Sequence, residues 1–171
     1  MTTTEAIAQA LDSAWNAVRQ STEGLSLAEI THRPTDQTNP IGWIVWHMYR
    51  VEDIVIYGVM QRQSAVWITG KWYEKFGLPD DPMMTGGRQT AEEVGKFQCP
   101  SPEDLMGYAL AVHEGASKYL NSIKDADLED IVKFFGNDRT RLQALTFIIG
   151  EMNQHAGQVA YLRGLIRGMN D

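Results

Sequence analysis

The chain has 171 residues, of which 43% are hydrophobic and 22% are charged, and its formal net charge is -7. This composition is typical of a globular protein and excludes a disordered chain, and no Lys/Arg cluster favours nucleic acid or an anionic membrane as a partner. No apolar run approaches the ~20 residues of a membrane span. We therefore expect a single domain over residues 1–171, with no nucleic-acid and no membrane partner.

The chain contains one cysteine, Cys99. A disulfide within the chain is thus impossible, and a reducing cytoplasm is the simplest location. The N-terminal residues lack the basic segment and apolar run of a signal peptide, which agrees with a cytoplasmic protein. Cys99 lies in a loop-like context without a basic neighbour to activate its thiol, so a nucleophilic role is not favoured.

Apolar residues at helical spacing predict a first helix from Thr4 to about Glu23, with Gly24 at its end. The segment Leu25–Ile30 has the spacing of a capping box and predicts a short helical turn that closes before Pro34. The polar residues that follow predict a loop.

Pro40 predicts the first turn of a second helix, capped by Asn39 and extending to about Arg62. His47 lies in the middle of the apolar stripe of this helix, whereas Glu52 and Asp53 fall away from it. A buried imidazole requires a polar partner. His47 is therefore a candidate functional residue.

Residues 63–100 are the least regular part of the chain and predict a long loop with a helical turn at Lys71–Phe76. Long loops in compact domains are often functional or mobile. Two interpretations of the aromatic residues in this segment stay open, the wall of a substrate pocket and an anchor that holds the loop on the core. These residues are Trp67, Trp72, Tyr73 and Phe76.

Ser101 and Pro102 predict the start of a third helix, which extends to about Ser122. Turns are expected at residues 125–131 and 134–137. The last helix is predicted from Arg139 to about Gly168, with glycine at every seventh position on one side (Gly150, Gly157 and Gly164). Such glycines favour the close approach of another helix, either within the subunit or across a dimer.

Four long helices joined by loops of unequal length predict an all-α fold, a four-helix bundle with a long loop between its second and third helices. Bundles of this kind place metal sites between facing helices. Glu151 and His155 lie four residues apart on one face of the last helix, and His47 offers a third ligand from the second helix. Two histidines and one carboxylate form a common catalytic metal set.

A structural alternative is that Glu151 and His155 pair with each other while His47 bonds a backbone carbonyl. The other histidines are weaker candidates. His113 lies beside the apolar rhythm of the third helix and is expected on the surface, and His32 lies at the end of a loop.

The chain resembles the DinB-like metalloprotein superfamily, which includes the N-terminal domain of mycothiol-dependent maleylpyruvate isomerases. The resemblance extends over essentially the whole chain. The stretches that carry it are Leu25–Ile30 with Arg33-Pro34, Asn39–His47 followed by Arg50, Glu52 and Asp53, and His155–Gln158.

This resemblance implies a DinB-like four-helix bundle, commonly a homodimer, with a divalent metal ion between the second and last helices. Glu151 stands where many members have a histidine, a variant of the isomerase-like branch that favours zinc and leaves nickel or manganese as alternatives. The length of the chain leaves no room for the C-terminal domain of the isomerase, so the isomerase reaction itself is not expected.

The resemblance also implies a transferase or isomerase-like reaction on a small molecule, with a low-molecular-weight thiol such as mycothiol as co-substrate. In this hypothesis His47, Glu151 and His155 bind the metal, while Arg50 and Gln158, one turn from ligands, act as catalytic residues that orient the ligands or the substrate. The alternative hypothesis is a non-catalytic dimeric helical binding protein whose metal is structural or absent.

Overall fold

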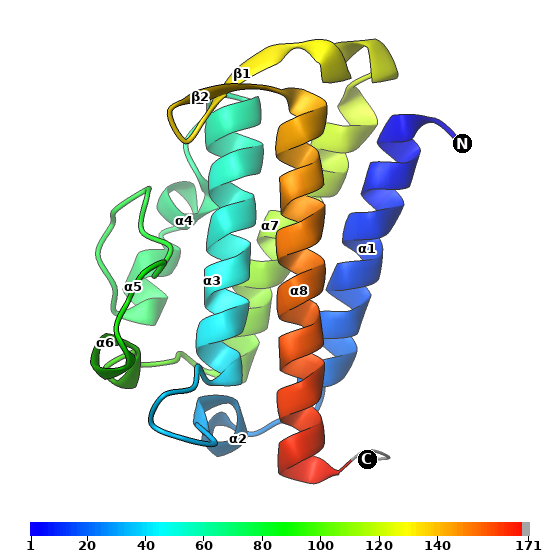
Figure 1. Ribbon diagram of the computed structural model, residues 1–171. Coiled ribbons are helices and arrows are strands. Elements are labelled where there is room, and N and C mark those ends of the chain that lie inside the picture. The colour runs from blue at the N-terminus through cyan, green and yellow to red at the C-terminus, as the bar shows by residue number, and fades with distance from the viewer. Residues whose placement is uncertain (169–171) are drawn as a thin grey trace.

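The computed structural model describes residues 1–168, and helices dominate it (Figure 1). Each of α1 and α3 packs against both α7 and α8. The all-α class that the sequence predicts is confirmed at the level of helix content. The four long helices are α1 (Thr3–Thr22), α3 (Ile41–Asp53), α7 (Pro102–Ser122) and α8 (Arg141–Arg167).

The helix starts follow the capping signals of the sequence with small shifts. Thr2, not Thr4, caps α1, because its hydroxyl accepts the N–H of Glu5 while the Glu5 carboxylate accepts the N–H of Thr2. The short helix α2 (Leu27–Thr31) begins with the predicted capping box at Ser26. In α3, Pro40 occupies the cap position and Ile41 is the first helical residue.

The predicted second helix changes character after Asp53. The chain continues as a π-helix, η1 (Ile54–Met60), and Arg62, with a φ of 55°, lies outside the helix. The Asp53 carboxylate accepts the backbone N–H groups of Val66 and Trp67, so it holds the start of the next helix against the end of α3. The observed helical segment therefore ends at Met60, slightly before the predicted end at about Arg62.

The long connection between η1 and α7 contains α4 (Val66–Thr69), α5 (Trp72–Phe76) and α6 (Ala91–Gly95). The sequence predicts only the second of these turns. Trp67 is fully buried, and its ring meets Phe76 and Tyr108 edge to face. These contacts support the interpretation that the aromatic residues anchor the connection to the core.

Between α7 and α8 the chain forms η2 (Asp125–Glu129) and an antiparallel hairpin of β1 (Ile131–Phe134) and β2 (Asn137–Thr140), with Phe134 opposite Asn137. The turn is predicted correctly, but its strands are not. Its residues Phe135 and Gly136 both have positive φ, as a type I′ turn requires. Phenylalanine at the first of these positions is an unusual signal for such a turn.

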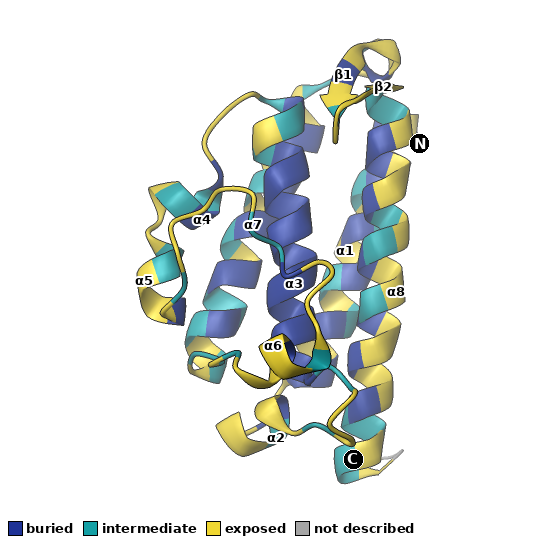
Figure 2. Ribbon diagram, turned by 60° about the vertical axis from the view of Figure 1, so that its left-hand side comes forward, coloured by how far each residue is buried: buried dark blue, intermediate teal, exposed yellow. Residues whose placement is uncertain are grey.

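The helix α3 is buried along its whole length (Figure 2). Arg50, Glu52 and Asp53 are fully buried, although the sequence pattern places the two acids away from the apolar stripe. Neither carboxylate oxygen of Glu52 has a hydrogen-bond partner among the described residues. Burial, followed by the charge of Asp53, raises the pKa of Glu52 to about 8. Among residues 1–168, every helix is too short or too polar to span a bilayer.

We predict that Glu52→Gln flattens the pH dependence of stability. The pKa of Glu52 lies above its unfolded value of 4.5, so the folded chain keeps a proton that the unfolded chain has released. Between pH 4.5 and about 8, Glu52 therefore lowers the free energy of unfolding by about 1.4 kcal/mol for each unit of rising pH. Urea unfolding at pH 5, 6, 7 and 8 should show the variant gaining stability relative to the wild type as pH rises.

The matched control is Glu114→Gln, which neutralises an exposed carboxylate on α7. Its free energy of unfolding should follow the wild-type pH dependence. If Glu52→Gln also ran parallel to the wild type, Glu52 would not be protonated in the folded protein.

Candidate metal centre

Three side chains from two helices converge at one point between α3 and α8. His47 comes from α3, and Glu151 and His155 come from α8; one ligand atom of each lies within 4.8 Å of the others. Oε1 of Glu151 lies 3.2 Å from Nε2 of His47 and 3.0 Å from Nε2 of His155. The side chains are 11%, 19% and 12% exposed for His47, Glu151 and His155, so the cluster is shielded yet open to a small ligand.

The other ring nitrogen of each histidine is held by the protein. Nδ1 of His47 lies 2.7 Å from the carbonyl oxygen of Thr85, and Nδ1 of His155 lies 2.7 Å from Oε1 of Gln158. A carbonyl oxygen only accepts, so Nδ1 of His47 is the donor. Metal-binding histidines are oriented in this way, with one N–H given to a fixed acceptor and the opposite nitrogen turned to the ion.

The charges of the cluster fit a divalent cation. Hydrogen bonds from His155 and His47 lower the pKa of Glu151 to about 2, so its carboxylate is ionised at neutral pH. Burial opposes the charged form of His155, but its hydrogen bonds to Glu151 and Gln158 outweigh burial and raise its pKa, so a metal ion at Nε2 would have to displace a proton. Two imidazole nitrogens and a carboxylate oxygen directed at one point are the donors that zinc and similar ions bind.

An aromatic surface fixes the ring plane of His47. Trp43, one turn earlier on α3, stacks on the imidazole at 4.9 Å between ring centroids and 11° between planes, and its Nε1–H donates to Oε1 of Gln89. Gly86, with a φ of 78°, packs so closely that a Cβ there would lie 2.5 Å from the ring of Trp46. The segment around Thr85 is therefore seated directly on the tryptophans of α3.

Arg50, which the sequence analysis proposes as catalytic, lies in a network of protein contacts. Its Nε–H donates to the carbonyl of Met84, and Nη2 donates to those of Asp81 and Pro82. Nη1 donates to Asp53 and to the hydroxyl of Tyr108. The side chain is fully buried. These five contacts match the five N–H donors of a guanidinium, which favours a positioning role over contact with a substrate.

Among the remaining candidates, Gln158 is adjacent to the cluster through its bond to His155, whereas His32 is exposed at the end of α2. The prediction that His113 is a surface residue is wrong. It is 9% exposed, stacks on Trp15 and has Nε2 3.2 Å from Asp12. Burial raises the pKa of the Cys99 thiol to about 12, which leaves the thiol protonated.

Two residues of the site are not predicted from the sequence. Thr85 accepts from the ring of His47, and Gln89 accepts from the ring of its stacking partner Trp43. Thr85 acts through its backbone carbonyl, and any residue type supplies that group. No pattern of side chains could have revealed it.

Comparisons with known proteins agree with the fold and the sequence motifs. The family model described as the DinB superfamily matches residues 10–159. The crystal structure of a conserved protein from Enterococcus faecalis is similar to this chain, with a TM-score of 0.86 and 27% sequence identity over 98% of this chain and 99% of that chain. No curated protein has significant similarity to the chain.

We predict that Arg50→Lys loosens the segment from Asp81 to Thr85 and weakens metal binding. Lysine keeps a charge for Asp53, but three donors on one nitrogen cannot replace the five that the guanidinium distributes over three nitrogens. Loss of the partner that orients a metal-binding histidine typically costs 10- to 100-fold in affinity. Because Arg50 acts one step further away, we expect about a 10-fold loss, with faster amide exchange between residues 81 and 87.

The matched control is Arg163→Lys, which changes another arginine whose guanidinium binds backbone carbonyls, those of Ser21 and Glu23. It should leave zinc affinity and exchange in residues 81–87 unchanged. Unchanged zinc affinity in Arg50→Lys would show that metal binding does not depend on Arg50, and unchanged amide exchange would show the same for the position of residues 81–87.

Proposed function

This chain belongs to the DinB superfamily, and we propose that it is a divalent-metal-dependent enzyme acting on a small molecule through His47, Glu151 and His155. One observation carries the proposal. Both histidines have Nδ1 engaged by a fixed oxygen, and both turn Nε2 toward the same carboxylate oxygen of Glu151. A cation placed between the three side chains would be bound by both Nε2 atoms and by the carboxylate oxygen.

Zinc is the proposed ion, with nickel or manganese as alternatives. When bound, such an ion would lower the pKa of a thiol or water and supply a nucleophile at neutral pH. Gln158 would keep His155 oriented through its bond to Nδ1, and Arg50 would keep the Thr85 carbonyl against His47. Three protein ligands leave coordination positions free, as catalytic sites require.

We propose a low-molecular-weight thiol, such as mycothiol, as co-substrate in an S-transferase or isomerase-like reaction. The protonation of the chain's cysteine thiol supports this proposal. Cys99 is the single cysteine, and its thiol, with a pKa of about 12, is not a nucleophile at neutral pH. A sulfur nucleophile would therefore come from outside the chain.

We further propose that residues 1–171 form one DinB-type four-helix bundle, with the long loop between α3 and α7, and that two copies associate through α8. A Cβ added at Gly150, Gly157 or Gly164 would meet no atom within 4 Å, so these glycines do not mediate close packing within the subunit. Phe147 and Tyr161 are exposed on the same helix. Small and aromatic residues on an open helix face suit a second copy of the chain.

We predict that the purified wild-type protein binds about one zinc ion per chain and that His155→Ala abolishes this binding. Removing one of three ligands leaves too few donors for a stoichiometric site. Elemental analysis after incubation with zinc, nickel or manganese and removal of free metal measures the content. The matched control is His113→Ala, which removes an equally buried histidine outside the cluster and should retain the metal.

Absence of metal from the wild type under all three conditions would refute the metal site and favour a non-catalytic binding protein. The thiol is tested separately on cobalt-loaded protein. Addition of mycothiol or glutathione should produce sulfur-to-cobalt charge-transfer absorption, and an unchanged spectrum with both would contradict the thiol assignment alone.

A further inference from the structure

A cavity of about 250 Å³ lies beside the metal cluster, between the start of α3 and the C-terminal half of α8. Ile44 on its wall is one helical turn before His47, and Gln158 is one turn after His155. The cavity thus borders the cluster on the side toward the C-terminus of α8. Its lining consists of Thr38, Asn39, Ile44, Gln158, Tyr161 and Leu162.

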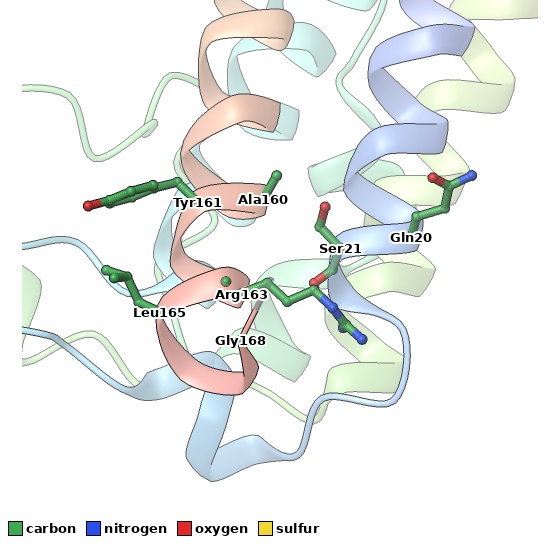
Figure 3. A pocket seen from close by; sticks show the side chains of 8 residues that line it. Gln20, Ser21, Ala160, Tyr161, Arg163, Leu165 and Gly168 are labelled. Carbon is green, nitrogen blue, oxygen red and sulfur yellow. The ribbon is translucent and has the colours of Figure 1, made fainter. Parts of the chain in front are cut away.

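A larger cavity, of about 600 Å³, lies between the C-terminal parts of α1 and α8, away from the cluster (Figure 3). None of its lining residues belongs to the His47, Glu151 and His155 cluster or bonds to it. Its arginine, Arg163, donates to the carbonyls of Ser21 and Glu23. Position relative to the cluster, not size, therefore identifies the smaller cavity as the candidate.

Gln158 connects the smaller cavity to the cluster. Its Oε1 accepts from Nδ1 of His155, which leaves the two N–H donors of the same amide for another group. Within residues 1–168, no hydrogen bond engages that amide nitrogen. Gln158 is exposed, so water reaches these donors, and an oxygen acceptor on a ligand, such as a carbonyl or hydroxyl group, would replace that water.

The lining also restricts the charge of a ligand. No Asp, Glu, Lys or Arg is among the six residues, and the buried side chains of Ile44 and Leu162 form an apolar wall. A phosphate or carboxylate placed against the apolar wall would find no cationic partner among the lining residues. An uncharged aromatic or branched group would instead gain from the removal of apolar surface from water.

We propose that this cavity binds the uncharged, apolar arm of the substrate while the reacting end of the same molecule lies at the metal. The inference rests on the proposed function and defines its substrate class. The substrate is a neutral small molecule with a metal-binding oxygen or sulfur group, a hydrogen-bond acceptor that reaches Gln158, and a hydrophobic arm about the size of a phenyl ring.

Two hydroxamates test the proposal, because they share a metal-binding head and differ only in the arm. Calorimetric titration of zinc-loaded protein should show benzohydroxamate binding at least about 10-fold more tightly than acetohydroxamate. Asn39→Phe, which fills the cavity, should remove most of this preference while leaving the affinity for acetohydroxamate unchanged. Leu110→Phe, an exposed change on α7 outside this cavity, should retain the preference.

A second pair of variants tests the wall by truncation in case Asn39→Phe disturbs folding. Leu162→Ala should weaken benzohydroxamate several-fold, whereas Val159→Ala, which truncates a buried residue of the same helix that is absent from the lining, should not. Equal affinity of wild type for the two hydroxamates would overturn the cavity while leaving the metal centre intact. Failure to bind zinc would overturn both, and a preference that survives Asn39→Phe and Leu162→Ala would place the arm elsewhere.

Discussion

The buried guanidinium of Arg50 is the interaction on which the other contacts of the site depend. A charge removed from water is costly unless opposite charge and hydrogen bonds replace its hydration. Here the carboxylate of Asp53 and the carbonyls of the long connection do so. Stacking against Trp67, with the guanidinium carbon 4.7 Å from the ring centroid, closes the remaining face. One side chain of α3 therefore determines where a distant stretch of chain lies.

The contacts of Arg50 also affect the candidate site, because adjacent residues of the long connection contact Arg50 and His47. Met84 accepts from Arg50, and its neighbour Thr85 accepts from His47. Gly86 then permits the backbone to lie against Trp46, where a side chain would collide. The loop thus acts as an extension of α3, and it fixes the orientation of the His47 ring. The α8 side of the cluster needs no such support, since Glu151, His155 and Gln158 occupy successive turns of one helix.

The sequence predicts the parts of this arrangement that depend on helical periodicity and leaves out those that depend on backbone groups. The long helices, the capping box of α2 and the convergence of His47 with α8 all follow from spacing. The hairpin, the π-helical continuation of α3 and the Thr85 carbonyl carry no such signal. The misplacement of Glu52 and Asp53, both on α3, has one cause. Amphipathic patterns assume that ionisable residues face water, and α3 is surrounded on every side.

Burial alone does not make a carboxylate a metal ligand, as two glutamates of this chain illustrate. Glu52 is fully buried without a hydrogen-bond partner for either oxygen, and its pKa of about 8 leaves it mostly protonated at neutral pH. Glu151 is more exposed, yet two imidazole groups lower its pKa to about 2. A carboxyl group must be ionised to bind a cation, and only Glu151 is ionised among these two at neutral pH. The same imidazoles that stabilise its charge are the other proposed ligands, so the carboxylate is prepared for a cation by the residues that would share it.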